Sequence, residues 1–168
     1  MYSTSTSAYV ADAVAKSCLF GPTSEVDLKE IDRLANTAVT LGASDFGAMP
    51  FFQVCKALSE YRLGHFSEAA QWAQKSVDST RYASWHACGV LAMADWRLGK
   101  KDEARAMLAR GEKLAPPVMP ARVAQSPGND WLAWLFARIQ LDEAKALIDP
   151  NAPHKAPQPN TKDPGHNG

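Results

Sequence analysis

The chain of 168 residues carries 18 basic and 18 acidic side chains, so its formal net charge at neutral pH is zero. Without a net field to attract phosphate backbones or anionic lipid headgroups, nucleic acid and membrane surfaces are not expected partners. The length fits one domain with a real core, and three cysteines without framework spacing indicate reduced, buried thiols rather than disulfides.

Residues 1–7 lack the basic and apolar regions of a signal peptide, and we expect them to be disordered. The longest apolar stretch, 87–94, is far shorter than the ~20 residues that span a bilayer. These features predict a cytoplasmic protein.

Two helices are predicted in the first quarter of the chain. The first covers residues 8–20, with Val10, Val14 and Cys18 four apart on one face. Ser24 with Asp27 three residues later resembles a capping box and predicts the start of the second, which Gly42 ends. Apolar residues at helical spacing fill that second helix: Leu28, Ile31, Leu34, Ala35, Ala38 and Val39.

Five further helices are predicted by apolar spacing and by glycine and proline breaks. Four prolines and the absence of periodicity predict a loop over residues 115–129, and residues 149–168 are predicted to be a disordered, proline-rich tail. The five helices cover approximately residues 50–63, 67–78, 83–98, 102–114 and 131–148.

The chain contains an internal repeat. The segment from Tyr61 to Ala69, YRLGHFSEA, returns as WRLGKKDEA from Trp96 to Ala104, a shift of 35 residues. An aromatic residue, Leu-Gly and Glu-Ala within helical sequence predict two helices joined by a tight turn. Repetition at this period is typical of a helical array, in which each unit buries its apolar face against its neighbours.

Residues 50–81 and 85–116 resemble the tetratricopeptide repeat. Four residues depart from the family pattern. Lys101 replaces an aromatic residue and Arg81 replaces a proline. Gln53 and Cys88 stand where the family often has tryptophan. The matching positions are Ala57 and Ala92, Gly64 and Gly99, Phe66, Ala69 and Ala104, Ser76 and Gly111, and Pro116. Residues 8–41 resemble a degenerate earlier repeat.

A narrower resemblance involves Val14–Phe20, the two Arg-Leu-Gly segments and Asp130–Leu135. These segments look like a bacterial module in which a similar repeat region closes proteins that begin with a serine/threonine kinase domain or carry WD40 repeats. The resemblance implies an accessory, partner-binding role beside a signalling domain. No kinase motif is present in the sequence itself.

In the tetratricopeptide family the first helix of each unit lines a concave groove, so the alignment implies candidate partner-binding residues. Tyr61-Arg62 and Trp96-Arg97 are equivalent pairs of an aromatic ring and a guanidinium, which is a frequent combination at binding hot spots. The alternative is that both rings only pack between helices. The candidates are Phe51, Leu58, Tyr61, Arg62, His86, Met93, Trp96 and Arg97.

No constellation in the sequence predicts catalysis, a cofactor or a metal. The four histidines form no His-Glu-x-x-His helix, and His86 with Cys88 provides two ligands at most. The ten glycines include no phosphate-binding cradle, and the basic residues of 97–113 alternate with acids.

The predicted architecture is all-α: a short α–α superhelix of about three helix pairs over residues 8–148, with 131–148 as a capping helix that seals the end of the array through Trp131 and Trp134. The predicted function is non-catalytic binding of a protein or peptide partner through the groove. The alternative is a structural spacer within a larger bacterial signalling protein.

Overall fold

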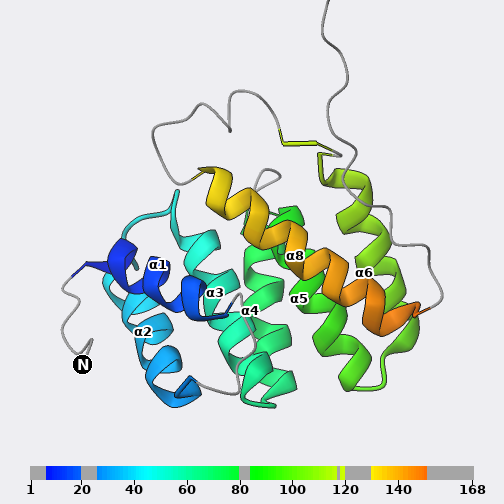
Figure 1. Cartoon of the computed structure of the whole chain (residues 1–168), viewed down its shortest axis with the longest axis horizontal. Helices are drawn as coiled ribbons and strands as arrows, with labels where there is room; N and C mark the ends of the chain where they lie inside the picture. Colours follow the sequence, from blue (N-terminus) through cyan, green and yellow to red (C-terminus); the bar gives the residue numbers. More distant parts are fainter. Residues whose placement is uncertain (1–6, 20–25, 80–83, 117, 120–129, 151–168) are drawn as a thin grey trace, which may run out of the picture.

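The computed structural model describes residues 7–19, 26–79, 84–116, 118–119 and 130–150. Within these ranges the chain forms seven α-helices and no strand, which confirms the predicted all-α class (Figure 1). The helices are α1 (Ala8–Leu19), α2 (Leu28–Leu41), α3 (Met49–Arg62), α4 (Phe66–Ser79), α5 (Ser84–Arg97), α6 (Lys101–Leu114) and α8 (Asp130–Ile148).

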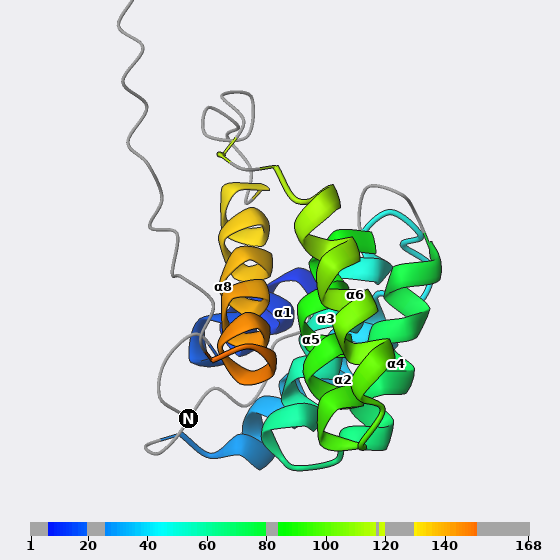
Figure 2. The same ribbon diagram turned by 90° about the vertical axis from the view of Figure 1, so that its right-hand side faces the viewer.

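The first six helices form three consecutive pairs that pack as an α–α array. Each helix packs on its neighbour along the chain, and α3 also packs directly on both α1 and α5. Helices α1, α3 and α5 thus make one layer, called here the inner layer. Figure 2 shows α4 and α6 on the far side of this layer from α8.

The helix boundaries agree closely with those predicted from glycine, proline and capping residues. Pro50 lies in the first turn of α3, where its missing N–H costs no helical bond. The N-cap of α2 is Asp27 itself, which accepts hydrogen bonds from the backbone N–H groups of Lys29 (3.0 Å) and Glu30 (3.4 Å). Ser24, predicted for that role, lies outside the described residues.

The predicted apolar face of α1 is wrong in part. Val14 and Cys18 are only partly buried against the core, and Val10 is 53% exposed. The face that points into the protein instead carries Ala11, Ala15 and Leu19, each fully buried. The small alanines allow α1 to lie close to α2 and α3, so close approach and not side-chain size decides which face is buried.

The two predicted repeats have the same turn geometry. Gly64 and Gly99 have φ values of 83° and 82°, in the left-handed region that favours glycine. In each turn the following residue donates its N–H to a carbonyl five residues back: His65 to Glu60 and Lys100 to Asp95, both 2.9 Å. The internal repeat is therefore confirmed as a structural repeat.

The same two turns carry equivalent contacts between a basic and an acidic side chain. The side chains of His65 and Glu60 lie 2.7 Å apart, and those of Lys100 and Asp95 lie 3.5 Å apart. Both base side chains are more than half exposed, so each pair adds little to stability and mainly fixes the turn.

Helix α8 covers the array from the inner side. We expected it to seal the end of the array against the last repeat. It does contact α6, but it packs more extensively on α5 and runs across the inner layer (Figures 1 and 2). Trp131, predicted to seal the end, is 44% exposed, whereas Trp134 packs against the core.

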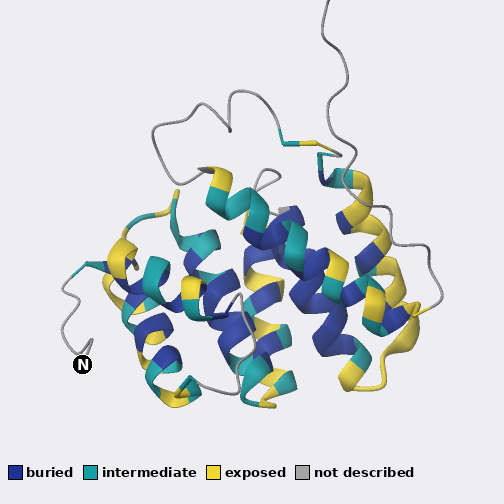
Figure 3. Cartoon of the chain, in the orientation of Figure 1, coloured by how far each residue is buried: buried dark blue, intermediate teal, exposed yellow. Residues whose placement is uncertain are grey.

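Buried and exposed surfaces follow this arrangement, with buried positions concentrated where α5 meets α6 and α8 (Figure 3). None of the helices in the described ranges is both long enough and apolar enough to cross a bilayer. The predicted disorder of 1–7 and 149–168 falls almost entirely outside the described residues.

Ala104 gives a direct test of the repeat register. It is fully buried on α6, so Ala104→Leu adds three carbons at a close helix contact and is expected to lower the free energy of unfolding by about 1–3 kcal/mol. Ala106→Leu, on the exposed side of the same helix, is the matched control. Equal melting temperatures of the two variants in thermal denaturation would contradict this packing.

Candidate functional site

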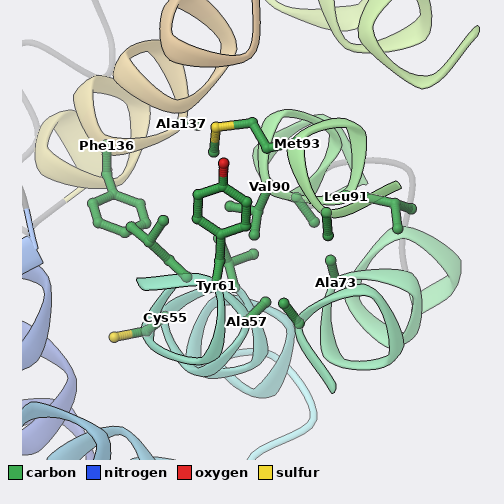
Figure 4. Close-up of a cluster of buried hydrophobic side chains, with 14 of the residues drawn as sticks. Cys55, Ala57, Tyr61, Ala73, Val90, Leu91, Met93, Phe136 and Ala137 are labelled. Carbon is green, nitrogen blue, oxygen red and sulfur yellow. The ribbon is translucent and has the colours of Figure 1, made fainter. Parts of the chain in front are cut away.

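The inner layer is the surface that the sequence predicts as a groove, and in the structure it already holds a helix. Figure 4 shows Phe136 and Ala137 of α8 facing Tyr61 of α3 and Met93 of α5. Phe136 is 2% exposed, and Ala137 and Met93 are completely buried. The candidate site is therefore the interface between α8 and the inner layer.

The closest approach in this interface is at Gly89 of α5. A Cβ atom at position 89 would lie 2.6 Å from the carbonyl carbon of Gln140 and 2.8 Å from the backbone nitrogen of Leu141. The neighbours are backbone atoms of α8, which no side-chain rotation can move away. Only glycine at position 89 lets the two helices cross at this distance.

The internal repeat shows that this glycine belongs to the crossing. The equivalent position in the first repeat, 35 residues earlier, is Val54, a buried core residue. Gly89 replaces that side chain where α8 passes. This difference between the repeats is a sequence signal that indicates where α8 docks.

Leu141 of α8 fills a second space left by a glycine. A Cβ atom at Gly111 of α6 would lie 2.6 Å from Leu141 Cδ2 and 2.7 Å from Cys88 Cβ. The equivalent residue in the first repeat is Ser76, whose hydroxyl donates to the carbonyl of Pro50 (2.8 Å). In the second repeat that space is taken by the leucine of α8.

An ion pair joins α8 to α3. Both terminal nitrogens of Arg62 donate to the carboxylate of Glu143, with Nη2 and Oε2 2.6 Å apart. Their side chains are 18% and 34% exposed, so the pair is partly shielded from water. Hydrogen bonding to Glu143 raises the pKa of Arg62 above its ordinary value, so the guanidinium stays charged at physiological pH.

Some polar atoms in the same interface lack partners. Within the described part of the chain, neither polar side-chain atom of Gln140 has a hydrogen-bond partner, although the residue is 0% exposed. Trp134 Nε1 and Arg62 Nε are also buried without a partner there. Such groups oppose docking, because they lose water and gain no hydrogen bond.

The predicted groove residues fall into two sets. Leu58 and Met93 are fully buried, and Tyr61 and His86 are 8% and 5% exposed, so these four lie in the interior of the protein. Phe51, Arg62 and Trp96 are partly buried, and Arg97 is exposed. The structure brings Phe51 and His86 together, with ring centroids 5.1 Å apart.

The equivalent aromatics differ in their surroundings. Tyr61 packs on Phe66, with ring centroids 5.4 Å apart, and Arg97 Nε lies 3.4 Å from the Tyr61 hydroxyl. Trp96 has Lys101 in place of that aromatic partner, with the ammonium nitrogen 3.5 Å from the ring centroid. The cation explains how the repeat tolerates the departure at position 101.

A small cavity lies at the α1 end of the interface. It has a volume of about 260 Å³ and is lined by α1, Ala48, Phe51 and Phe52 near the start of α3, and Leu132 and Ala133 of α8. Lys16 and Asp12 border it and form a buried ion pair of 2.6 Å. Burial raises the pKa of Asp12 despite the neighbouring ammonium.

The thiols of Cys55 and Cys88 show none of the activation that a nucleophile needs. Burial raises the pKa of Cys55 well above its ordinary value and that of Cys88 to about 11. Both groups therefore stay protonated at neutral pH. No group of three or more potential metal ligands occurs among the described residues.

Sequence reasoning missed Gly89, Gln140 and Glu143 as residues of the site. It placed the correct helices on the inner side but did not predict that the last helix would lie on them. The comparison of the chain with known protein families, curated proteins and solved structures gave no match.

Replacing Gly89 tests the crossing. Gly89→Val places at position 89 the valine that the first repeat has at position 54. Because the Cβ atom of this valine would meet the backbone of α8, we expect α8 to be displaced. Hydrogen exchange within 130–148 should then rise toward that of an unprotected helix, while α3 and α4 keep their protection. The control is Gly47→Ala in an exposed turn, where the nearest atom to an added Cβ is 3.6 Å away. Unchanged protection of α8 in Gly89→Val would contradict the geometry.

Thiol labelling gives a second prediction. At pH 8, Cys18, which is only partly buried, should react with iodoacetamide at least about tenfold faster than Cys55 or Cys88. Peptide mass spectrometry after timed labelling measures each site. Equal rates at all three cysteines would show that the interior opens readily.

Proposed function

We propose that this protein is a non-catalytic interaction module, resembling tetratricopeptide repeats, that binds a helical segment of a protein or peptide partner along its inner layer. The observation that carries the proposal is α8 itself. A helix of 19 residues lies on the inner layer, so this surface has the shape and apolar character that helix binding requires.

The contacts of α8 include elements of specificity as well as apolar burial. Gly89 and Gly111 form two depressions that accept the backbone of one turn and the side chain of Leu141. Arg62 adds a charged group that recognises a carboxylate at one end of the interface. A surface of this kind selects a partner helix that has a small residue at the crossing with Gly89, a leucine at Gly111 and an acidic residue at Arg62.

A second candidate is a spacer within a larger bacterial signalling protein. Tyr9 and Val10 of α1 and Phe46 of the α2–α3 turn are 60%, 53% and 85% exposed. Exposed apolar side chains at the end of an array suit contact with a further unit. A spacer uses this end surface and has no need of an accessible inner layer.

Binding of an α8 peptide supplied as a separate molecule tests the proposal. In the full-length Leu141→Asp variant the chain's own α8 should leave the inner layer, because a buried charge replaces the side chain next to Gly111. A fluorescent peptide of residues 130–149 should bind this variant with micromolar affinity, about −8 kcal/mol, as measured by anisotropy.

The control peptide carries Leu141→Asp and should not bind. Circular dichroism and a cooperative thermal transition check that the variant protein stays folded and helical, and Glu143→Arg serves as a milder host if it does not. If the unmodified peptide binds neither folded variant, the proposal that the inner layer binds a helix is wrong, and the spacer is the remaining candidate function.

A further inference from the structure

Helix α8 docks on the inner layer with an unpaired polar side chain in the interface, which is called here the defect. The side chain of Gln140 is completely buried at the crossing with α5, and among the described residues it finds no hydrogen-bond partner for its amide nitrogen or its oxygen. A buried polar group left unpaired lowers a docking equilibrium by about five- to a hundredfold. Trp134 Nε1, six residues earlier in the same helix, is a second buried group without a partner among the described residues.

Apart from Trp134 Nε1 and Arg62 Nε, which are also unpaired within the described ranges, the contacts around Gln140 are well formed. Ala137, Leu141 and Ala144 are 0–2% exposed, and Leu141 fits the depression at Gly111. Glu143 is held by two hydrogen bonds from Arg62. The inner layer thus matches α8 at every one of these positions and mismatches it at Gln140.

The covalent connection explains how a helix with this defect stays docked. Helix α6 ends at Leu114 and α8 begins at Asp130, so a short segment joins them. A short linker holds a tethered ligand at an effective concentration of about 1 mM. A helix whose intrinsic dissociation constant is about 10 μM then remains docked about 99% of the time.

We propose that α8 is a displaceable occupant of the inner layer, and that the partner is an amphipathic helix with the α8 contact pattern but an apolar residue in place of Gln140. This inference rests on the proposed function. The partner helix places a small residue beside Gly89, a leucine at Gly111 and a carboxylate at Arg62. Because the partner helix has an apolar residue where α8 has Gln140, it buries no unpaired amide. The partner helix therefore binds the inner layer more tightly than α8 does, and this extra affinity is needed to displace a tethered competitor.

The test compares two peptides of residues 130–149 on the unmodified full-length protein. One has the α8 sequence and the other carries Gln140→Met, which keeps the length of the side chain and removes its polar atoms. The methionine peptide should bind at least about tenfold more tightly by anisotropy, a difference of 1.4 kcal/mol. A third peptide that adds Glu143→Lys to Gln140→Met should lose this gain, because it opposes Arg62 with a like charge.

Displacement is measured on the protein itself. With isotopically labelled protein and unlabelled peptide, hydrogen exchange within α8 should rise as the methionine peptide binds. Binding that leaves α8 protected would place the peptide at another surface and overturn the proposal, as would equal affinities of the first two peptides.

The same substitution within the chain gives the converse result. Gln140→Met in the full-length protein should raise the melting temperature and weaken binding of either peptide about tenfold, because its own α8 then docks without the defect. Gln71→Met, at an exposed position of α4, is the matched control and should change neither quantity.

The outcomes separate this inference from the proposed function. If no peptide binds the folded Leu141→Asp protein, the inner layer does not accept helices and both proposals fall. If peptides bind that protein but Gln140→Met changes nothing in peptide or chain, the inner layer is a helix site and the displacement proposal alone is wrong.

Discussion

Helices α5 and α8 cross with their backbones in near contact at Gly89, and the inner side of the protein depends on this crossing. Any side chain at position 89 would meet main-chain atoms of Gln140 and Leu141. With the helices at this distance, Leu141 reaches the depression at Gly111, and Glu143 reaches Arg62 on α3. One missing side chain therefore sets the position of a whole helix and closes the surface beneath it.

The interface combines contacts that favour docking of α8 with buried polar groups that oppose it. Apolar contacts along α8 and the ion pair to Arg62 favour docking, whereas the buried amide of Gln140 opposes it. A helix selected only for stability would carry an apolar residue at that position. A tethered helix needs less intrinsic affinity, because its local concentration is high.

The two clear repeats show how one unit acquires different uses. The turns at Gly64 and Gly99 are the same in backbone conformation and in their acid–base pairs. The helices differ where they meet other parts of the protein, as Val54 is replaced by Gly89 and Ser76 by Gly111. The turn geometry is local and is preserved in both units, whereas the contact surface has changed in the unit that receives α8.

The sequence by itself determined the helices, their boundaries and the pairing of neighbours. These follow from local spacing, from glycines with positive φ such as Gly64, and from caps such as Asp27. Only the tertiary structure decided that α8 lies on the inner layer, and that Leu58, Tyr61 and Met93 are covered instead of open to a partner. The physical reason is that periodicity identifies an apolar face but not the surface that will cover it. That choice depends on backbone approach between residues far apart in the chain, here Gly89 and Gln140, which local patterns do not encode.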